Sequence, residues 1–107
     1  MTVSGRHVAS YGAHERPGDF SWATRDSGVT TSIVLSCPNC GARHAVGVKP
    51  GDPRGWSWNG DRERPTLTPS IFFSSGHVPH GLSDDRTDEQ KACRWHGYLT
   101  NGKWVPA

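Results

Sequence analysis

The sequence predicts a small all-β domain made of hairpins, arranged as a sandwich or a partly open barrel. Three observations support this fold class. The chain has 107 residues, which suits one domain spanning residues 1–107. Only 33% of the residues are apolar, and 13 Gly and 8 Pro favour a turn-rich β protein over a helical bundle. Short segments of alternating polarity, separated by turn residues, recur along the chain.

The first half of the chain predicts an irregular arm followed by three strands. Residues 1–18 contain Gly and Pro and end in a turn, so we expect an irregular N-terminal arm. Apolar and polar residues alternate in 19–25, which predicts the first strand, and Asp26-Ser27-Gly28 is turn chemistry. The apolar run 33–35 and the run 45–48 then predict two strands on either side of a short turn.

The segment 56–73 predicts a second pair of extended elements. Two tryptophans at strand spacing in 56–58 precede Asn59-Gly60, a hairpin turn signal. The run 65–73 is extended, but its two prolines restrict it to a sheet edge or a bulge. Residues 74–81 predict a loop, and 87–90 fit a capping box that begins a single helical turn.

The C-terminal segment 98–105 predicts a two-residue hairpin. Asn101-Gly102 supplies the two positive φ angles that a type I′ turn requires. With this turn, Leu99 pairs with Trp104, and Tyr98 with Val105.

Two short cysteine clusters predict a metal site. Cys37 and Cys40 are three positions apart, as are Cys93 and His96, and these are all the cysteines of the chain. Three thiolates and one imidazole form the ligand set of a closed structural zinc site, here a zinc-ribbon-like pair of knuckles. Zinc binding supplies roughly 10–16 kcal/mol of apparent folding energy in small domains. We therefore predict zinc as the cofactor, with His44 as the alternative fourth ligand.

The cysteine count and the charge restrict the compartment and the partners. Three cysteines argue against a disulfide framework and for a reducing compartment. The first ten residues lack the apolar stretch of a signal peptide, and no segment is apolar enough to span a membrane. The predicted location is the cytoplasm. A net charge of +2, with 12 basic and 10 acidic residues, does not require a polyanionic partner.

A nucleic-acid interface is the alternative use of the Arg and Trp residues. Stacking rings and phosphate-tracking arginines would come from Arg54, Trp56, Trp58, Arg62 and Arg64. Acidic residues are interspersed with these arginines, and tryptophans beside hairpins are typical core residues. We therefore favour a mixed charged face over a basic groove.

Several of these motifs resemble a family of short uncharacterised proteins encoded by bacteriophages. The similar motifs are Cys37-Pro-x-Cys40-Gly, the block 55–61 (Gly-Trp-Ser-Trp-Asn-Gly-Asp), the block 65–71 (Pro-Thr-Leu-Thr-Pro-Ser-Ile), and the Cys/His element before the final hairpin. The resemblance covers residues 33–107. It implies a phage origin and zinc binding and no defined activity, although members are often labelled ammonia monooxygenase.

These observations predict a structural or interaction protein rather than an enzyme. A zinc deaminase needs His-x-Glu before Pro-Cys-x-x-Cys, and no such pattern is present. Hydrolase chemistry needs a spare nucleophile with a paired base, and no serine lies in a nucleophile-elbow motif. The predicted role is a zinc-binding virion accessory, such as a capsid-decoration or tail-associated subunit. It would act in the host cytoplasm or in the virion and would contact other virion proteins or itself. The alternative is a nucleic-acid-binding zinc module of the infected cell; we predict no small-molecule substrate.

Overall fold

The computed structural model describes residues 2–73 and 94–107. Apart from one short 3₁₀ helix, η1 (Tyr11–Ala13), the elements of this part of the chain are strands. These are β1 (Val3–Ser4), β2 (Arg6–His7), β3 (Asp19–Thr24), β4 (Thr30–Ser36), β5 (Arg43–Gly47), β6 (Ser57–Trp58), β7 (Leu67–Phe73), β8 (Trp95–Thr100) and β9 (Lys103–Pro106). The predicted all-β class is confirmed. The loop and the helical turn predicted for 74–81 and 87–90 lie outside the described residues.

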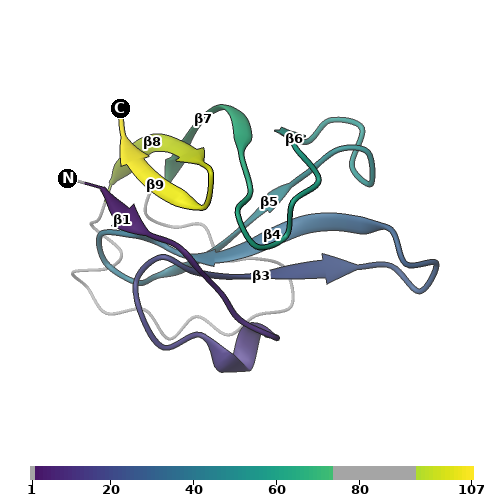
Figure 1. Ribbon diagram of the computed structural model, residues 1–107, viewed down its shortest axis with the longest axis horizontal. Coiled ribbons are helices and arrows are strands. Elements are labelled where there is room, and N and C mark those ends of the chain that lie inside the picture. Colours follow the sequence, from purple (N-terminus) through teal and green to yellow (C-terminus); the bar gives the residue numbers. More distant parts are fainter. Residues whose placement is uncertain (1, 74–93) are drawn as a thin grey trace.

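The strands form two sheets. One sheet has the order β1-β9-β8-β7-β6, and the other has the order β2-β3-β4-β5. In Figure 1, β3, β4 and β5 cross the molecule below the hairpin of β8 and β9, and the two chain ends lie at the same end of the molecule. No helix in the described part of the chain is long and apolar enough to cross a membrane.

Both sheets contribute to one hydrophobic core, as in a sandwich. The four-stranded sheet supplies Phe20, Ile33, Leu35 and Val46, and the five-stranded sheet supplies Leu67, Ile71, Leu99 and Trp104. Trp104 is fully buried, and its indole N–H donates to the Gly18 carbonyl at 3.0 Å. This hydrogen bond fastens the C-terminal hairpin to the turn that precedes β3.

The N-terminal arm is less irregular than the sequence suggested. It pairs β1 with β9 in one sheet and then β2 with β3 in the other, so it crosses from sheet to sheet at Gly5. A Cβ at Gly5 would lie 2.6 Å from the Gly102 carbonyl oxygen, so only glycine fits there. These edge pairings involve partner residues far along the chain, which local patterns do not reveal.

The predicted hairpin of β8 and β9 is confirmed in its register. Tyr98 pairs with Val105 and Leu99 with Trp104. Asn101 and Gly102 have φ angles of 49° and 77°, as a type I′ turn requires. Along β8, exposed residues alternate with the buried Gly97 and Leu99. One face of this strand therefore points away from the core.

Strand β7 contains the predicted irregularity. Leu67 pairs with Leu99 and Ile71 with Gly97, so three residues of β7 (68–70) lie opposite one residue of β8, Tyr98. Pro69 lies in this bulge, where no ladder N–H is needed, and follows a cis peptide bond. Bulges redirect the side chains that follow or occupy them. Here the bulge contains Ser70.

Candidate active site

The bulge of β7 brings a serine and a histidine together on the outer face of the five-stranded sheet. The Oγ of Ser70 lies 2.9 Å from the Nε2 of His96, within hydrogen-bond distance. Ser70 is half-buried and His96 is exposed. The two residues come from adjacent strands, with His96 directly opposite Phe72. The pair therefore lies at the surface of the molecule.

Trp56 holds the backbone around Ser70. Its indole N–H donates to the carbonyls of Pro69 at 3.0 Å and Ser70 at 3.2 Å. The Trp56 backbone is in turn paired with the end of β5, because its amide donates to the Gly47 carbonyl at 2.8 Å. The bulge is therefore anchored through Trp56 to the opposite sheet.

On the β8 side, Gly97 allows His96 to take its position. A Cβ at Gly97 would lie 2.3 Å from the Val105 carbonyl oxygen and 2.5 Å from the Trp95 ring. Trp95 packs beneath β8 against the core and makes an edge contact with Trp104, at 6.0 Å between ring centroids. Because Trp95 covers the inner face here, His96 extends to the outer face.

A second serine–histidine cluster lies on the four-stranded sheet. The His14 ring contacts two hydroxyls, Ser36 Oγ from Nδ1 and Ser21 Oγ from Nε2, each at 2.9 Å. All three side chains are buried. Burial, followed by the nearby Arg43 charge, lowers the pKa of His14. The segment between β2 and β3 carries His14 and covers this cluster. Through His14 it connects β3, which carries Ser21, to β4, which carries Ser36.

An ion pair supports that covering segment. The Arg6 guanidinium donates to both carboxylate oxygens of Asp19, at 2.9 and 2.6 Å. Asp19 is buried and also accepts the amides of Glu15 and Arg16, at 2.8 and 2.9 Å. The hydrogen bonds from Arg6 lower the pKa of Asp19 far below its usual range. This carboxylate is ionised and fixes the chain on either side of His14.

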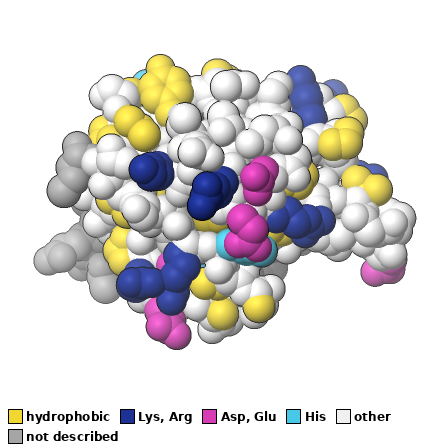
Figure 2. Space-filling view, viewed as in Figure 1, with side chains coloured by type: hydrophobic (Ala, Val, Ile, Leu, Met, Phe, Trp, Pro, Cys, Tyr) yellow, Lys and Arg dark blue, Asp and Glu magenta, His cyan; other side chains and the backbone are white. Residues whose placement is uncertain are grey.

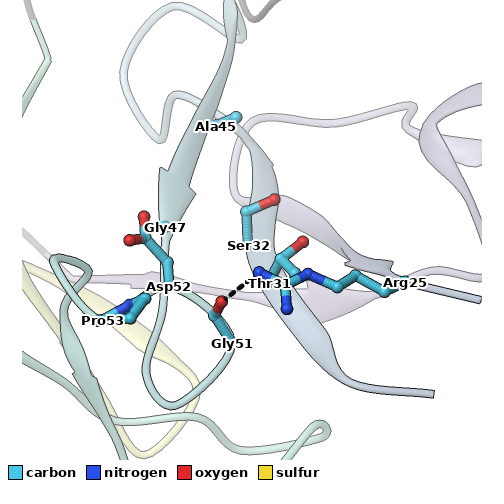
Figure 3. Close-up of a pocket in the computed structure, with 8 residues that line it drawn as sticks. All are labelled: Arg25, Thr31, Ser32, Ala45, Gly47, Gly51, Asp52 and Pro53. Carbon is cyan, nitrogen blue, oxygen red and sulfur yellow. Dashed lines mark hydrogen bonds between the residues drawn. The ribbon is translucent and has the colours of Figure 1, made fainter. Parts of the chain in front are cut away.

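The four-stranded sheet also carries a shallow hollow of about 410 Å³. Figure 3 shows Arg25 extending to the Gly51 carbonyl, which its Nη2 reaches at 2.8 Å, with Asp52 beside Gly47. The hollow is lined by Arg25, Thr31, Ser32, Ala45, Gly47, Gly51, Asp52 and Pro53. None of these residues is a histidine or cysteine, so the lining has no serine–imidazole pair.

The residues predicted to bind zinc, as far as they are described, come from both sheets. Cys37 and Cys40 lie in the turn between β4 and β5, where Cys37 is buried in the core. His44 is buried on β5, and His96 is hydrogen-bonded to Ser70 on the other sheet. Among residues 2–73 and 94–107, no three His, Cys, Asp or Glu side chains converge as a metal site. Cys93 lies outside the described residues, so the zinc site stays a prediction.

The residues proposed for nucleic-acid contact have other contacts in the fold. Trp56 and Trp58 pack partly buried against the core, and Trp58 also contacts the Trp22 ring at 4.6 Å between centroids. The Arg62 guanidinium donates to the Thr30 hydroxyl. Arg54 and Arg64 are exposed. On the face of the molecule shown in Figure 2, acidic side chains are interspersed with basic ones and form no continuous basic groove.

A hydroxyl hydrogen-bonded to an imidazole on an open surface is the pairing used by serine hydrolases. The comparison with known families agrees with this class. A family model described as BubE, "Bacterial ubiquitination-like system serine protease", matches residues 7–107. The chain therefore belongs to the BubE family. No curated protein and no solved structure matches the chain.

The family assignment corrects our functional predictions. The family is one of serine proteases, so the prediction of a non-enzymatic virion accessory is wrong, and so is its alternative, a nucleic-acid-binding module. The predicted place in a virion and the predicted structural role are wrong for the same reason. The match neither supports nor contradicts the phage origin that the resemblance implied. The description places the family in a ubiquitination-like system, which acts on proteins. The prediction of protein partners therefore stands, and the prediction of virion partners does not.

The prediction of a non-enzymatic protein was wrong because we expected a serine nucleophile only in a nucleophile-elbow motif. A nucleophile elbow lies between a strand and a helix, whereas the serine of the Ser70–His96 pair lies within a strand bulge. The spacing of His96 from Cys93 predicts a zinc ligand, and that prediction is separate from the correction of the function. The available signal was the pair of prolines before Ser70, which predicted an irregular strand at the correct place.

Proposed function

We propose that this protein hydrolyses peptide bonds, with Ser70 as the nucleophile and His96 as the general base. The observation that carries this proposal is the 2.9 Å contact between Ser70 Oγ and His96 Nε2 on an accessible face. Membership of a serine protease family supplies the reaction class. The roles of the two residues come from their geometry.

The reaction follows from the positions of these two atoms. The neutral His96 ring removes the hydroxyl proton as Ser70 Oγ attacks the substrate carbonyl carbon. The imidazolium then gives that proton to the amine that leaves, and an acyl-serine ester remains. A water molecule, deprotonated by the same ring, attacks the ester, which releases the carboxylic acid and restores Ser70.

Trp56 is a positioning residue in this scheme. Its indole N–H donates to the Pro69 and Ser70 carbonyls, which lie on either side of the Ser70 Cα, and so limits movement of the nucleophile relative to His96. Misplacement of a reacting atom by about 1 Å costs on the order of 100-fold in rate. The support for Ser70 is therefore part of the proposed machinery.

A fluorophosphonate probe tests the assignment directly, because it reacts with activated serines. We expect stoichiometric labelling of the purified full-length protein at Ser70 and no labelling of Ser70→Ala. His96→Ala should slow labelling by about 100-fold or more. Ser57→Ala is the matched control, since Ser57 is exposed on the neighbouring strand β6, opposite Thr68. Labelling of Ser70→Ala at the wild-type rate would refute the proposal.

A further inference from the structure

The outer face around Ser70 and His96 carries two exposed aromatic side chains. Phe72 is 59% exposed and Tyr98 is 44% exposed. The only other large hydrophobic side chain exposed in the described part of the chain is Val29, at 37%, in the turn between β3 and β4. Two of these three exposed groups thus flank the proposed catalytic pair. Scattered single apolar residues are normal on a surface, but such clustering is informative.

The sheet register explains why the two rings lie around the pair. Phe72 is directly opposite His96, and their ring centroids are 6.2 Å apart in an edge arrangement. Tyr98 is the residue of β8 that faces the bulge containing Ser70. Tyr98 and His96 are two positions apart on β8, so their side chains project from the same face. One ring therefore lies on the histidine side, and the other on the serine side.

We infer that Phe72 and Tyr98 form the subsite that receives an apolar side chain of the substrate, next to the bond that is cleaved. This inference rests on the proposed function, because it assigns the bond to Ser70. The occupant is an extended polypeptide with an aliphatic or aromatic residue at that position. Figure 2 shows hydrophobic side chains at the surface of the end where Figure 1 places β8 and β9.

The physical argument is continuity of the apolar surface with the reacting atoms. Val105, half-buried on β9 and opposite Tyr98, extends the apolar surface along the same face. An aliphatic side chain laid across these residues would remove apolar area from water on both partners. It would also shield the contact between Ser70 and His96 from solvent, which strengthens electrostatic interactions there. A carboxylate side chain in the same place would lose hydration without a partner on these rings.

A pair of small esters measures this subsite with the whole protein. We would compare N-acetyl-leucine and N-acetyl-glycine p-nitrophenyl esters, which differ only in the side chain next to the cleaved bond. The wild-type protein should prefer the leucine ester by about 10- to 100-fold in kcat/KM. Phe72→Ala combined with Tyr98→Ala should reduce that preference mainly by raising KM for the leucine ester. Val29→Ala is the matched control and should keep the full preference.

The outcomes separate the two proposals. Equal use of both esters by the wild-type protein, or a preference that survives in the double variant, would overturn the subsite. Failure to hydrolyse either ester while fluorophosphonate still labels Ser70 would overturn it as well. If Ser70 is not labelled at all, the proposed function fails and the subsite fails with it. Labelling of the double variant at Ser70 shows that its fold and catalytic pair are intact.

Discussion

The two sheets of this protein each hold a serine–histidine contact of 2.9 Å, and only one of them is accessible. On the five-stranded sheet, Ser70 and His96 face outward from a bulge. On the four-stranded sheet, His14 lies between Ser21 and Ser36, and the three residues are between 2% and 6% exposed. The distance alone does not distinguish a nucleophile from a structural hydrogen bond. Access for a substrate does.

The burial of each cluster also determines what it contributes. A buried imidazole that satisfies two buried hydroxyls contributes to stability, because each unpaired polar group would cost free energy. An exposed pair gains little stability, since water can replace either partner, but it remains available for chemistry. We therefore expect variants of the first cluster to change stability and variants of the second to change activity.

The largest expected effect is on catalysis. Ser70→Ala should lower the hydrolysis rate by about 10³-fold or more, because loss of a catalytic serine leaves only binding and electrostatic contributions. Steady-state hydrolysis of a p-nitrophenyl ester measures this change. Ser21→Ala in the buried cluster should leave the rate per folded molecule within about twofold. The reverse pattern would move the active site to the four-stranded sheet.

The second effect is on stability. His14→Ala should lower the free energy of unfolding by about 2–4 kcal/mol, since it creates a cavity and leaves the Ser21 and Ser36 hydroxyls without the ring. Urea unfolding followed by tryptophan fluorescence measures the change. The counterpart variant His96→Ala is expected to stay within about 0.5 kcal/mol of the wild type, as is usual for exposed sites. A larger loss for His96→Ala than for His14→Ala would contradict the comparison.

A smaller effect is expected from the residue that supports Ser70. Trp56→Phe keeps an aromatic ring but removes the donor to the Pro69 and Ser70 carbonyls, so kcat should fall by about 10-fold with KM nearly unchanged. Trp58→Phe removes a similar donor, which bonds to the Asp61 carbonyl at 3.1 Å, away from Ser70. It serves as the control. Equal losses in both variants would indicate a general effect on the fold.

The pH dependence of stability tests the role of the buried cluster around His14. The pKa of His14 is lowered by burial from its ordinary 6.5, so the unfolded chain takes up this proton more readily than the folded one. The free energy of unfolding should be highest above pH 6.5 and decrease as the pH falls below it. Urea titrations at several pH values measure this change, and it should be absent in His14→Gln.

A second decrease is expected at lower pH. The Arg6 hydrogen bonds lower the pKa of Asp19 from 3.8, so stability from this carboxylate is complete above that pH and is lost as the pH falls further. Asp19→Asn should remove this second step and leave the first in place. A wild-type stability that is constant between pH 7 and pH 3 would contradict both assignments.

Local patterns in the sequence determined most of the strands. Alternation of polarity in 19–25 and the positive-φ turn at Asn101-Gly102 depend on neighbours a few residues apart, and both features appear as predicted. The prolines of 65–73 likewise indicated an irregular strand. What local patterns could not show is the pairing of β1 with β9 and of β2 with β3, because the partner residues are distant in the chain.

The candidate site is the part that only the tertiary structure decided. Ser70 and His96 are 26 positions apart in sequence, and their contact depends on a three-residue bulge that changes the register of β7 against β8. In the sequence, the spacing of His96 from Cys93 predicts a metal ligand and gives no sign of the contact with Ser70. A local spacing records which side chains are close along the chain. Only strand pairing and burial determine which histidine of the described residues meets a serine at the surface.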